Sequence, residues 1–140
     1  MSPAKPDSPD GRTNKQRGAL YEAAFGYYAT RAGCEVFTSN ADHSVVDAIV
    51  ISEMGQVYRV QIKGTEGEKV VTVKTTKGAK GKVLSESEYD VLAVYAAAYD
   101  LWYLIPSHMV NKRRTLKIYP MFPNSKGQYE IYRGNWNVFK

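Results

Sequence analysis

The first regular pattern along the chain is helical. From residue 14 or 15 to about residue 32, side chains recur at spacings of three and four, and Gly33 follows as a helix stop. The recurring residues are Leu20, Ala23, Ala24, Tyr27, Tyr28 and Arg31. This spacing predicts an amphipathic helix, and we expect Tyr27 and Tyr28 to pack in the core.

The period then changes to that of β-strands. Val36 and Phe37 end a short strand, and residues 45–51 are β-branched and nearly all apolar, as in a strand buried on both faces. Residues 54–56 form a turn, and residues 57–63 alternate strictly, so the two long strands are predicted to form a hairpin. The alternation places Tyr58, Val60 and Ile62 on one face and Arg59, Gln61 and Lys63 on the other.

The rest of the chain predicts short strands and one long loop. The strand-forming stretches are residues 70–73, 89–95, 101–105, 115–119 and 128–132. Residues 75–87 are rich in Gly, Lys and Ser and predict a mobile loop. A second helix could form only as a short one, at residues 76–88 or 107–111. Tyr95, Trp102, Trp136 and Phe139 are expected to pack on the core.

Composition limits the kind of protein. A chain of 140 residues with 44% hydrophobic content suits one domain, which we place at residues 14–140 after a polar, Pro-rich arm at residues 1–13 that we expect to be disordered. The single cysteine, Cys34, excludes an internal disulfide and a Cys-rich zinc site, and we expect it to be buried at the start of a strand. Without an apolar run of about 18 residues or an apolar signal stretch, we expect a cytoplasmic protein with no membrane partner.

Asp47 is the first residue that indicates chemistry. It stands inside the apolar run at residues 45–51, where a buried carboxylate is costly unless a cation or several hydrogen-bond donors compensate it. A structural explanation remains open at this point, because an Arg or Lys partner or a capped backbone group would also compensate the charge.

The next strand supplies Gln61 and Lys63 on one face, about 7 Å apart along the strand. If residues 53–55 form a three-residue hairpin loop, Asp47 lies directly across from Gln61 on that face. A two-residue loop would place Asp47 opposite Ile62 and turn it away. The hairpin register therefore decides whether these side chains can act together.

Such an oxygen-rich cluster would suit Mg²⁺, with Mn²⁺ able to take its place. Asp47 would be the principal ligand, Gln61 would offer its neutral amide oxygen, and Glu22 on the helix could add a carboxylate directly or through water. Lys63 would orient the attacking water and stabilise charge developing at phosphorus. The alternative for Lys63 is an ordinary strand lysine that faces solvent.

Two basic clusters follow the proposed site, in keeping with a net charge of +5 that favours an anionic partner. Each would suit contact with the phosphates of a nucleic acid, and the alternative for the first cluster is a solvated basic loop. The clusters are Lys69, Lys74, Lys77, Lys80 and Lys82, and then Lys112, Arg113 and Arg114. His43 and His108 are expected to have no catalytic role.

Three predicted elements follow one another in a characteristic order: a helix with Glu22, an apolar strand with Val46-Asp47, and a paired strand that ends Val60-Gln61-Ile62-Lys63. This order resembles that of the PD-(D/E)XK nuclease superfamily. Within it, the chain is similar to small intron-encoded homing endonucleases and related bacterial and phage endonucleases, in which Q-x-K also replaces (D/E)-x-K. Residues 91–95 and 101–106 are similar to the later strands of that group, so the likeness covers about residues 15–105.

The resemblance implies an α/β (α+β) fold with a restriction-endonuclease-like core, a mixed β-sheet flanked by helices. It implies metal binding by Asp47, Gln61, the carbonyl of Ile62 and Glu22, and a catalytic amine on Lys63. The implied reaction is hydrolysis of a DNA phosphodiester that leaves a 5′-phosphate and a 3′-hydroxyl. Val46 stands where the superfamily's name has proline, a departure that the superfamily tolerates.

Three functions stay open on the sequence. A homing-type endonuclease would need two active sites to cut both strands, and therefore a homodimer or homotetramer. A structure-specific nuclease similar to archaeal Holliday junction resolvases shares the order of Glu, Asp and x-x-Lys. A DNA-binding module with a decayed site, with Gln61 as the lesion, is the third.

Overall fold

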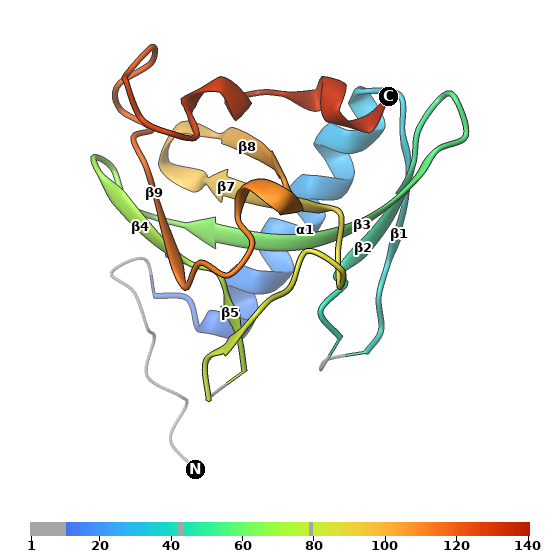
Figure 1. The fold of residues 1–140 in the computed structure, drawn as a ribbon, viewed down its shortest axis with the longest axis horizontal. Coiled ribbons are helices and arrows are strands. Elements are labelled where there is room, and N and C mark those ends of the chain that lie inside the picture. Colours follow the sequence, from blue (N-terminus) through green and yellow to red (C-terminus); the bar gives the residue numbers. More distant parts are fainter. Residues whose placement is uncertain (1–10, 42–43, 79) are drawn as a thin grey trace.

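The computed structural model describes residues 11–41, 44–78 and 80–140 (Figure 1). Residues 1–10 of the expected arm and His43 lie outside this part. No helix within it has the length and apolarity needed to cross a membrane. The longer elements are α1 (Asn14–Arg31), β1 (Glu35–Thr38), β2 (Ala48–Ile51), β3 (Val57–Thr65), β4 (Val71–Lys74), β7 (Val91–Ala96), β8 (Leu101–Pro106) and β9 (Thr115–Ile118). The shorter ones are strands β5 (Thr76–Lys77) and β6 (Lys82–Val83) and 3₁₀ turns Ala97–Tyr99, Ser107–Met109, Glu130–Tyr132 and Trp136–Phe139.

The central sheet has five strands in the order β1-β2-β3-β7-β8. Strands β3 and β7 are parallel, and the other neighbours are antiparallel, so the sheet is mixed as expected. Its two faces carry separate cores: α1 and the C-terminal turn pack on one, and β4 and β9 cover the other (Figure 1). Residues of β7 and β8 alternate between the two cores, because successive side chains of a strand point to opposite faces.

Helix α1 begins and ends where the sequence predicts, but it buries a different face. Thr13 and Gln16 form a capping box at its start, and Gly33 follows its end with φ +92°. The buried side chains are Tyr21, Phe25 and Ala29, at strict spacings of four. The predicted face is therefore wrong in part, since Leu20 is 40% exposed and Tyr27 is 57% exposed. Ala24 and Tyr28 pack only against the edge of the core.

The β2–β3 hairpin has the register that the active-site hypothesis requires. The amide N–H of Ser52 donates to Gln56 O (2.9 Å), which leaves a three-residue loop at residues 53–55, with Gly55 at φ +83°. Ala48 pairs with Val60 in the same register. Asp47, one residue before β2, therefore comes opposite Gln61 rather than Ile62.

Several other expectations are corrected. Residues 128–132 form a 3₁₀ turn in place of a strand, and residues 76–88 contain the small β5–β6 hairpin in place of a helix. Residues 107–109 form only a 3₁₀ turn, so α1 is the one α-helix of the described residues. The expected burial of Cys34, Tyr95, Trp102 and Phe139 is confirmed, with Trp136 packed against the same core.

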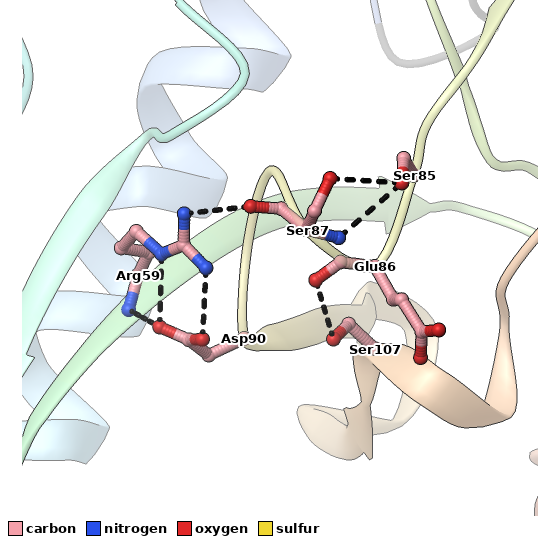
Figure 2. Close-up of polar contacts among 6 residues, drawn as sticks. All are labelled: Arg59, Ser85, Glu86, Ser87, Asp90 and Ser107. Carbon is pink, nitrogen blue, oxygen red and sulfur yellow. Dashed lines mark hydrogen bonds and ion pairs between the residues drawn. The ribbon is translucent and has the colours of Figure 1, made fainter.

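A buttress formed by Arg59 and Asp90 holds the start of β7 beside β3 (Figure 2). Both carboxylate oxygens of Asp90 accept from Arg59, from the backbone N–H at 2.7 Å, Nε at 3.1 Å and Nη2 at 3.1 Å. Nη1 of Arg59 donates to Ser87 O (2.9 Å), and the Asp90 N–H donates back to Arg59 O (2.8 Å). These bonds fix the register of a parallel strand pair whose connection runs through β4, β5 and β6.

We expect Asp90→Asn to lower the free energy of unfolding by about 1 kcal/mol at neutral pH, since the bidentate ion pair is lost from a partly exposed site. The hydrogen bonds from Arg59 lower the pKa of the Asp90 carboxyl. Its contribution is complete above the ordinary value of 3.8 and disappears as the pH falls through the lower pKa of the folded protein. Urea unfolding at pH 7 and pH 3 should therefore show the difference shrinking in acid. Glu35→Gln, at an exposed position of β1, is the control, and an equal loss in both variants would contradict the prediction.

Candidate active site

Asp47 is half-buried at the end of the sheet and held from three sides. Its backbone N–H donates to Val60 O (2.8 Å), and its carbonyl accepts from Ser39 N (2.9 Å). Its Oδ2 accepts from Ile62 N (2.8 Å) and from Gln61 Nε2 (2.9 Å). Burial raises the pKa of the Asp47 carboxyl, against the opposing effects of the Ile62 N–H and the charges of Lys77 and Lys63. The carboxylate thus caps a backbone group, one of the structural explanations left open, without leaving the candidate site.

Gln61 is the unsatisfied member of the cluster. The residue is only 2% exposed, and its Nε2 donates to Asp47. Within the described part of the chain, its Oε1 is buried without a hydrogen-bond partner. A buried polar atom left in this state costs about 1 to 3 kcal/mol, so the Gln61 oxygen is a candidate ligand for a cation.

Lys63 follows on the same face of β3. Its Nζ donates to the carbonyl of Thr76 (2.9 Å), and its side chain is half-buried. Burial lowers the pKa of the Lys63 amine, and the neighbouring charge of Lys77 lowers it further, while Asp47 acts in the opposite direction. Lys63 therefore does not face solvent as an ordinary strand lysine would.

A cleft of about 760 Å³ brings the candidate residues together. Glu22 from α1 lines it with Asp47, Gln61, Ile62 and Lys63. The helix can approach the strand because residue 64 is glycine: a Cβ there would lie 2.2 Å from the ring of Tyr21. Four candidate side chains and the Ile62 backbone thus share one cavity between the helix and the end of β3.

The basic residues separate into groups. Lys74 and Lys77 line the cleft, a position that the sequence did not assign to them. Lys82 forms an ion pair with Glu88 (3.5 Å), and Arg114 Nη1 donates to Gly81 O (3.2 Å), so both brace the β5–β6 hairpin. Away from the cleft lining, the structure places Lys69, Lys80, Lys112 and Arg113 at exposed positions, as it does His108.

Sequence reasoning missed two charged residues of the cleft, Arg17 and Glu66. Glu66 lies in the segment after β3, and its Oε1 is 3.9 Å from Nη1 of Arg12. Arg17 lies four residues before Tyr21, another residue that lines the cleft, so the two side chains share one face of α1. That helical spacing was the available signal, but it becomes informative only once the helix face is known.

The donor set fits a hard divalent cation. Among the described residues, no group of three or more His, Cys, Asp or Glu side chains is placed to hold a metal ion. The cleft instead holds the carboxylate of Asp47 and the unsatisfied amide oxygen of Gln61, and it is also lined by Ile62 and by Glu22 from α1. Oxygen donors with few charges suit Mg²⁺, which keeps several waters and uses substrate phosphate as a ligand.

Comparison with known proteins identifies the family and supports the fold. The sequence matches the family described as PD-(D/E)XK endonuclease over residues 12–133. The chain belongs to this family. The coarse function that membership gives is that of a nuclease, and family members generally use divalent metals. No curated protein matches the sequence.

Two solved structures resemble this PD-(D/E)XK protein in fold. The bacterial homing endonuclease I-Ssp6803I matches with a TM-score of 0.71 and 18% identity, over 90% of each chain. Hjc from Archaeoglobus fulgidus, a Holliday junction resolvase from an archaeal hyperthermophile, matches with a TM-score of 0.51 and 12% identity, over 83% of this chain and 95% of its own. The expected restriction-endonuclease-like fold is thereby confirmed.

We expect Gly64→Ala to destabilise the protein by about 1 to 3 kcal/mol, because the new methyl group would overlap the Tyr21 ring and push α1 away from β3. Gly26→Ala is the matched control, since a Cβ there meets nothing within 4 Å and helical alanine is favoured over glycine by about 0.5 to 1 kcal/mol. Thermal unfolding of the two variants measures both effects. A Gly64→Ala protein as stable as Gly26→Ala would show that this contact does not set the helix position.

Proposed function

We propose that the protein is a Mg²⁺-dependent endonuclease that hydrolyses phosphodiester bonds of DNA, with a mode of action like that of homing endonucleases. The observation that carries the proposal is the pairing, in one cleft, of the buried Asp47 carboxylate with the unsatisfied Gln61 oxygen and the Lys63 amine. Family membership supports a nuclease, and the fold likeness to a homing endonuclease supports the finer assignment.

The metal-binding side of the site would consist of Asp47, Gln61 and the Ile62 carbonyl, with Glu22 supporting from α1. When bound, Mg²⁺ would neutralise the phosphate and make a coordinated water more acidic. The Ile62 N–H and the Gln61 amide orient the Asp47 carboxylate toward the cleft. Because Gln61 is neutral, the protein supplies less negative charge than two adjacent acids would, and phosphate would have to complete the site.

Lys63 would act on the attacking water and on the charge that develops at phosphorus. Its bond to Thr76 O fixes the position of Nζ before DNA arrives. Burial and Lys77 both favour the neutral amine, whereas a phosphate in the cleft would favour the charged one. The amine can therefore exchange a proton or stabilise charge within the site without a large change in geometry.

A double-strand cut would require two such clefts, and we propose that the protein works as a homodimer or homotetramer for this reason. The exposed cations Lys69, Lys80, Lys112 and Arg113 would contact DNA outside the cleft. A resolvase-like nuclease is the second candidate, supported by the fold likeness to Hjc. Cleavage of a synthetic four-way junction in preference to a linear duplex would favour it.

We expect Lys63→Ala to lower the rate of plasmid nicking with Mg²⁺ by at least about 100-fold, because charge at phosphorus loses its stabilising amine. DNA binding should persist in a mobility-shift assay, and EDTA should stop nicking by the wild type. Lys126→Ala, an exposed lysine outside the cleft, is expected to nick at the wild-type rate. A wild-type protein that binds DNA but never nicks it with Mg²⁺ would point to the non-catalytic binding module.

We expect Gln61→Glu to lower the stability of the metal-free protein and to raise its affinity for Mg²⁺. In EDTA the variant should have a lower Tm, because the bond to Asp47 is replaced by repulsion between two carboxylates. Mg²⁺ should then raise its Tm by more than it raises that of the wild type, since a ligand that binds the native state stabilises it. Gln56→Glu, in the exposed hairpin turn, adds the same charge away from the site and serves as control. Equal Mg²⁺ effects in all three proteins would remove Gln61 from the metal site.

A further inference from the structure

Among the described residues, three side-chain cations other than Lys63 line the cleft, one on the wall formed by α1 and two on the wall formed by β4 and β5. Arg17 belongs to the first turns of α1, and Lys74 and Lys77 belong to β4 and β5. The metal-binding candidates Asp47 and Gln61 lie in the same cavity. Positive charge is therefore supplied to the cleft from three separate elements, an arrangement that the linear sequence does not display.

Arg17 is fixed on the helix wall. Its Nη1 donates to Arg12 O (3.0 Å), and its Nη2 donates to Asn14 Oδ1. Gly18, the next residue, also lines the cleft, and a Cβ added there would meet nothing within 4 Å. The guanidinium is thus held in place on the part of α1 that lines the cleft.

The wall formed by β4 and β5 is braced by the backbone around Thr75. Thr75 is 2% exposed, its N–H donates to Arg114 O (2.9 Å), and its hydroxyl donates to Arg113 O. Lys63 Nζ binds the carbonyl of the next residue, Thr76. Lys74 and Lys77 flank this fixed segment, so their side chains start from a rigid base.

The acidic groups of the cleft are placed differently. Asp47 and Glu22 belong to the proposed metal site, and Glu66 lies near Arg12 at 3.9 Å. A chain of phosphates could therefore meet cations on either side of the metal site. Carboxylates at the centre would face the cation that neutralises them.

We propose that Arg17 on one wall and Lys74 with Lys77 on the other form phosphate subsites for the cut DNA strand, on the two sides of the scissile phosphate. This inference rests on the proposed nuclease function. Each subsite binds a backbone phosphate through charge-assisted hydrogen bonds and carries no base specificity. Arg17 is the decisive member, because α1 contributes no other cation to the cleft lining.

The test measures how DNA binding depends on salt. Fluorescence anisotropy with a labelled duplex, in Ca²⁺ in place of Mg²⁺, gives the slope of log K against log salt concentration for Arg17→Gln, Lys74→Gln and Arg31→Gln. Each lost phosphate contact should make the slope less steep by about 0.9. We expect this change for Arg17→Gln and Lys74→Gln. Arg31→Gln removes the same charge at the far end of α1, outside the cleft, and should keep the wild-type slope.

Arg17→Lys changes the side chain but keeps its positive charge, so its slope should stay close to that of the wild type. This variant therefore distinguishes a loss of charge from a loss of folding. The inference is overturned if Arg17→Gln and Arg31→Gln have the same slope while the wild type cuts DNA with Mg²⁺. If the wild type neither binds nor cuts DNA, the proposed function fails and the subsites fail with it. A changed slope in Arg17→Gln and Lys74→Gln, with both variants folded by circular dichroism, supports the subsites.

Discussion

The half-buried carboxylate of Asp47 is the constraint on which the site and much of the sheet edge depend. A charge in this position must be compensated, and the protein does so with the Ile62 N–H and the Gln61 amide, both from the neighbouring strand. Those bonds require the three-residue loop of the β2–β3 hairpin, because a shift by one residue would turn Asp47 to the other face. The hairpin register that compensates the Asp47 charge is therefore also the register that the proposed chemistry needs.

The compensation is incomplete, and that incompleteness is the basis for proposing the cluster as a site. The amide Nε2 of Gln61 donates to Asp47, and its Oε1 is buried without a hydrogen-bond partner among the described residues. Burial raises the pKa of Asp47 and lowers that of Lys63, so each group is in an environment that disfavours its charge. A divalent cation and a phosphate would relieve both costs at once, which a purely structural ion pair would already have done.

The parts of the candidate site that depend on neighbouring residues of the chain could be predicted from the sequence. Gln61 and Lys63 lie on the same face of β3 because side chains of a strand alternate with a period of two. Asp47 lies opposite Gln61 because the hairpin loop has three residues. The face of α1 was mispredicted because Tyr21 is buried by the absence of a side chain at residue 64, a contact across 43 residues of sequence. Arg17 and Glu66 were missed for the same reason, since only the packing of the helix on the strand brings them to the cleft.

The position of Lys63 connects the chemistry to the basic segment that follows it. Its amine donates to Thr76 O, while Lys77, the next residue, lines the cleft and acts on the pKa values of both Asp47 and Lys63. Strand β5 is held by Thr75 to the backbone of Arg113 and Arg114. A displacement of this two-residue strand would therefore alter the position of the amine and the charge around the carboxylate together. The stability of the two-residue strand β5 therefore bears on the proposed active site as well as on the loop itself.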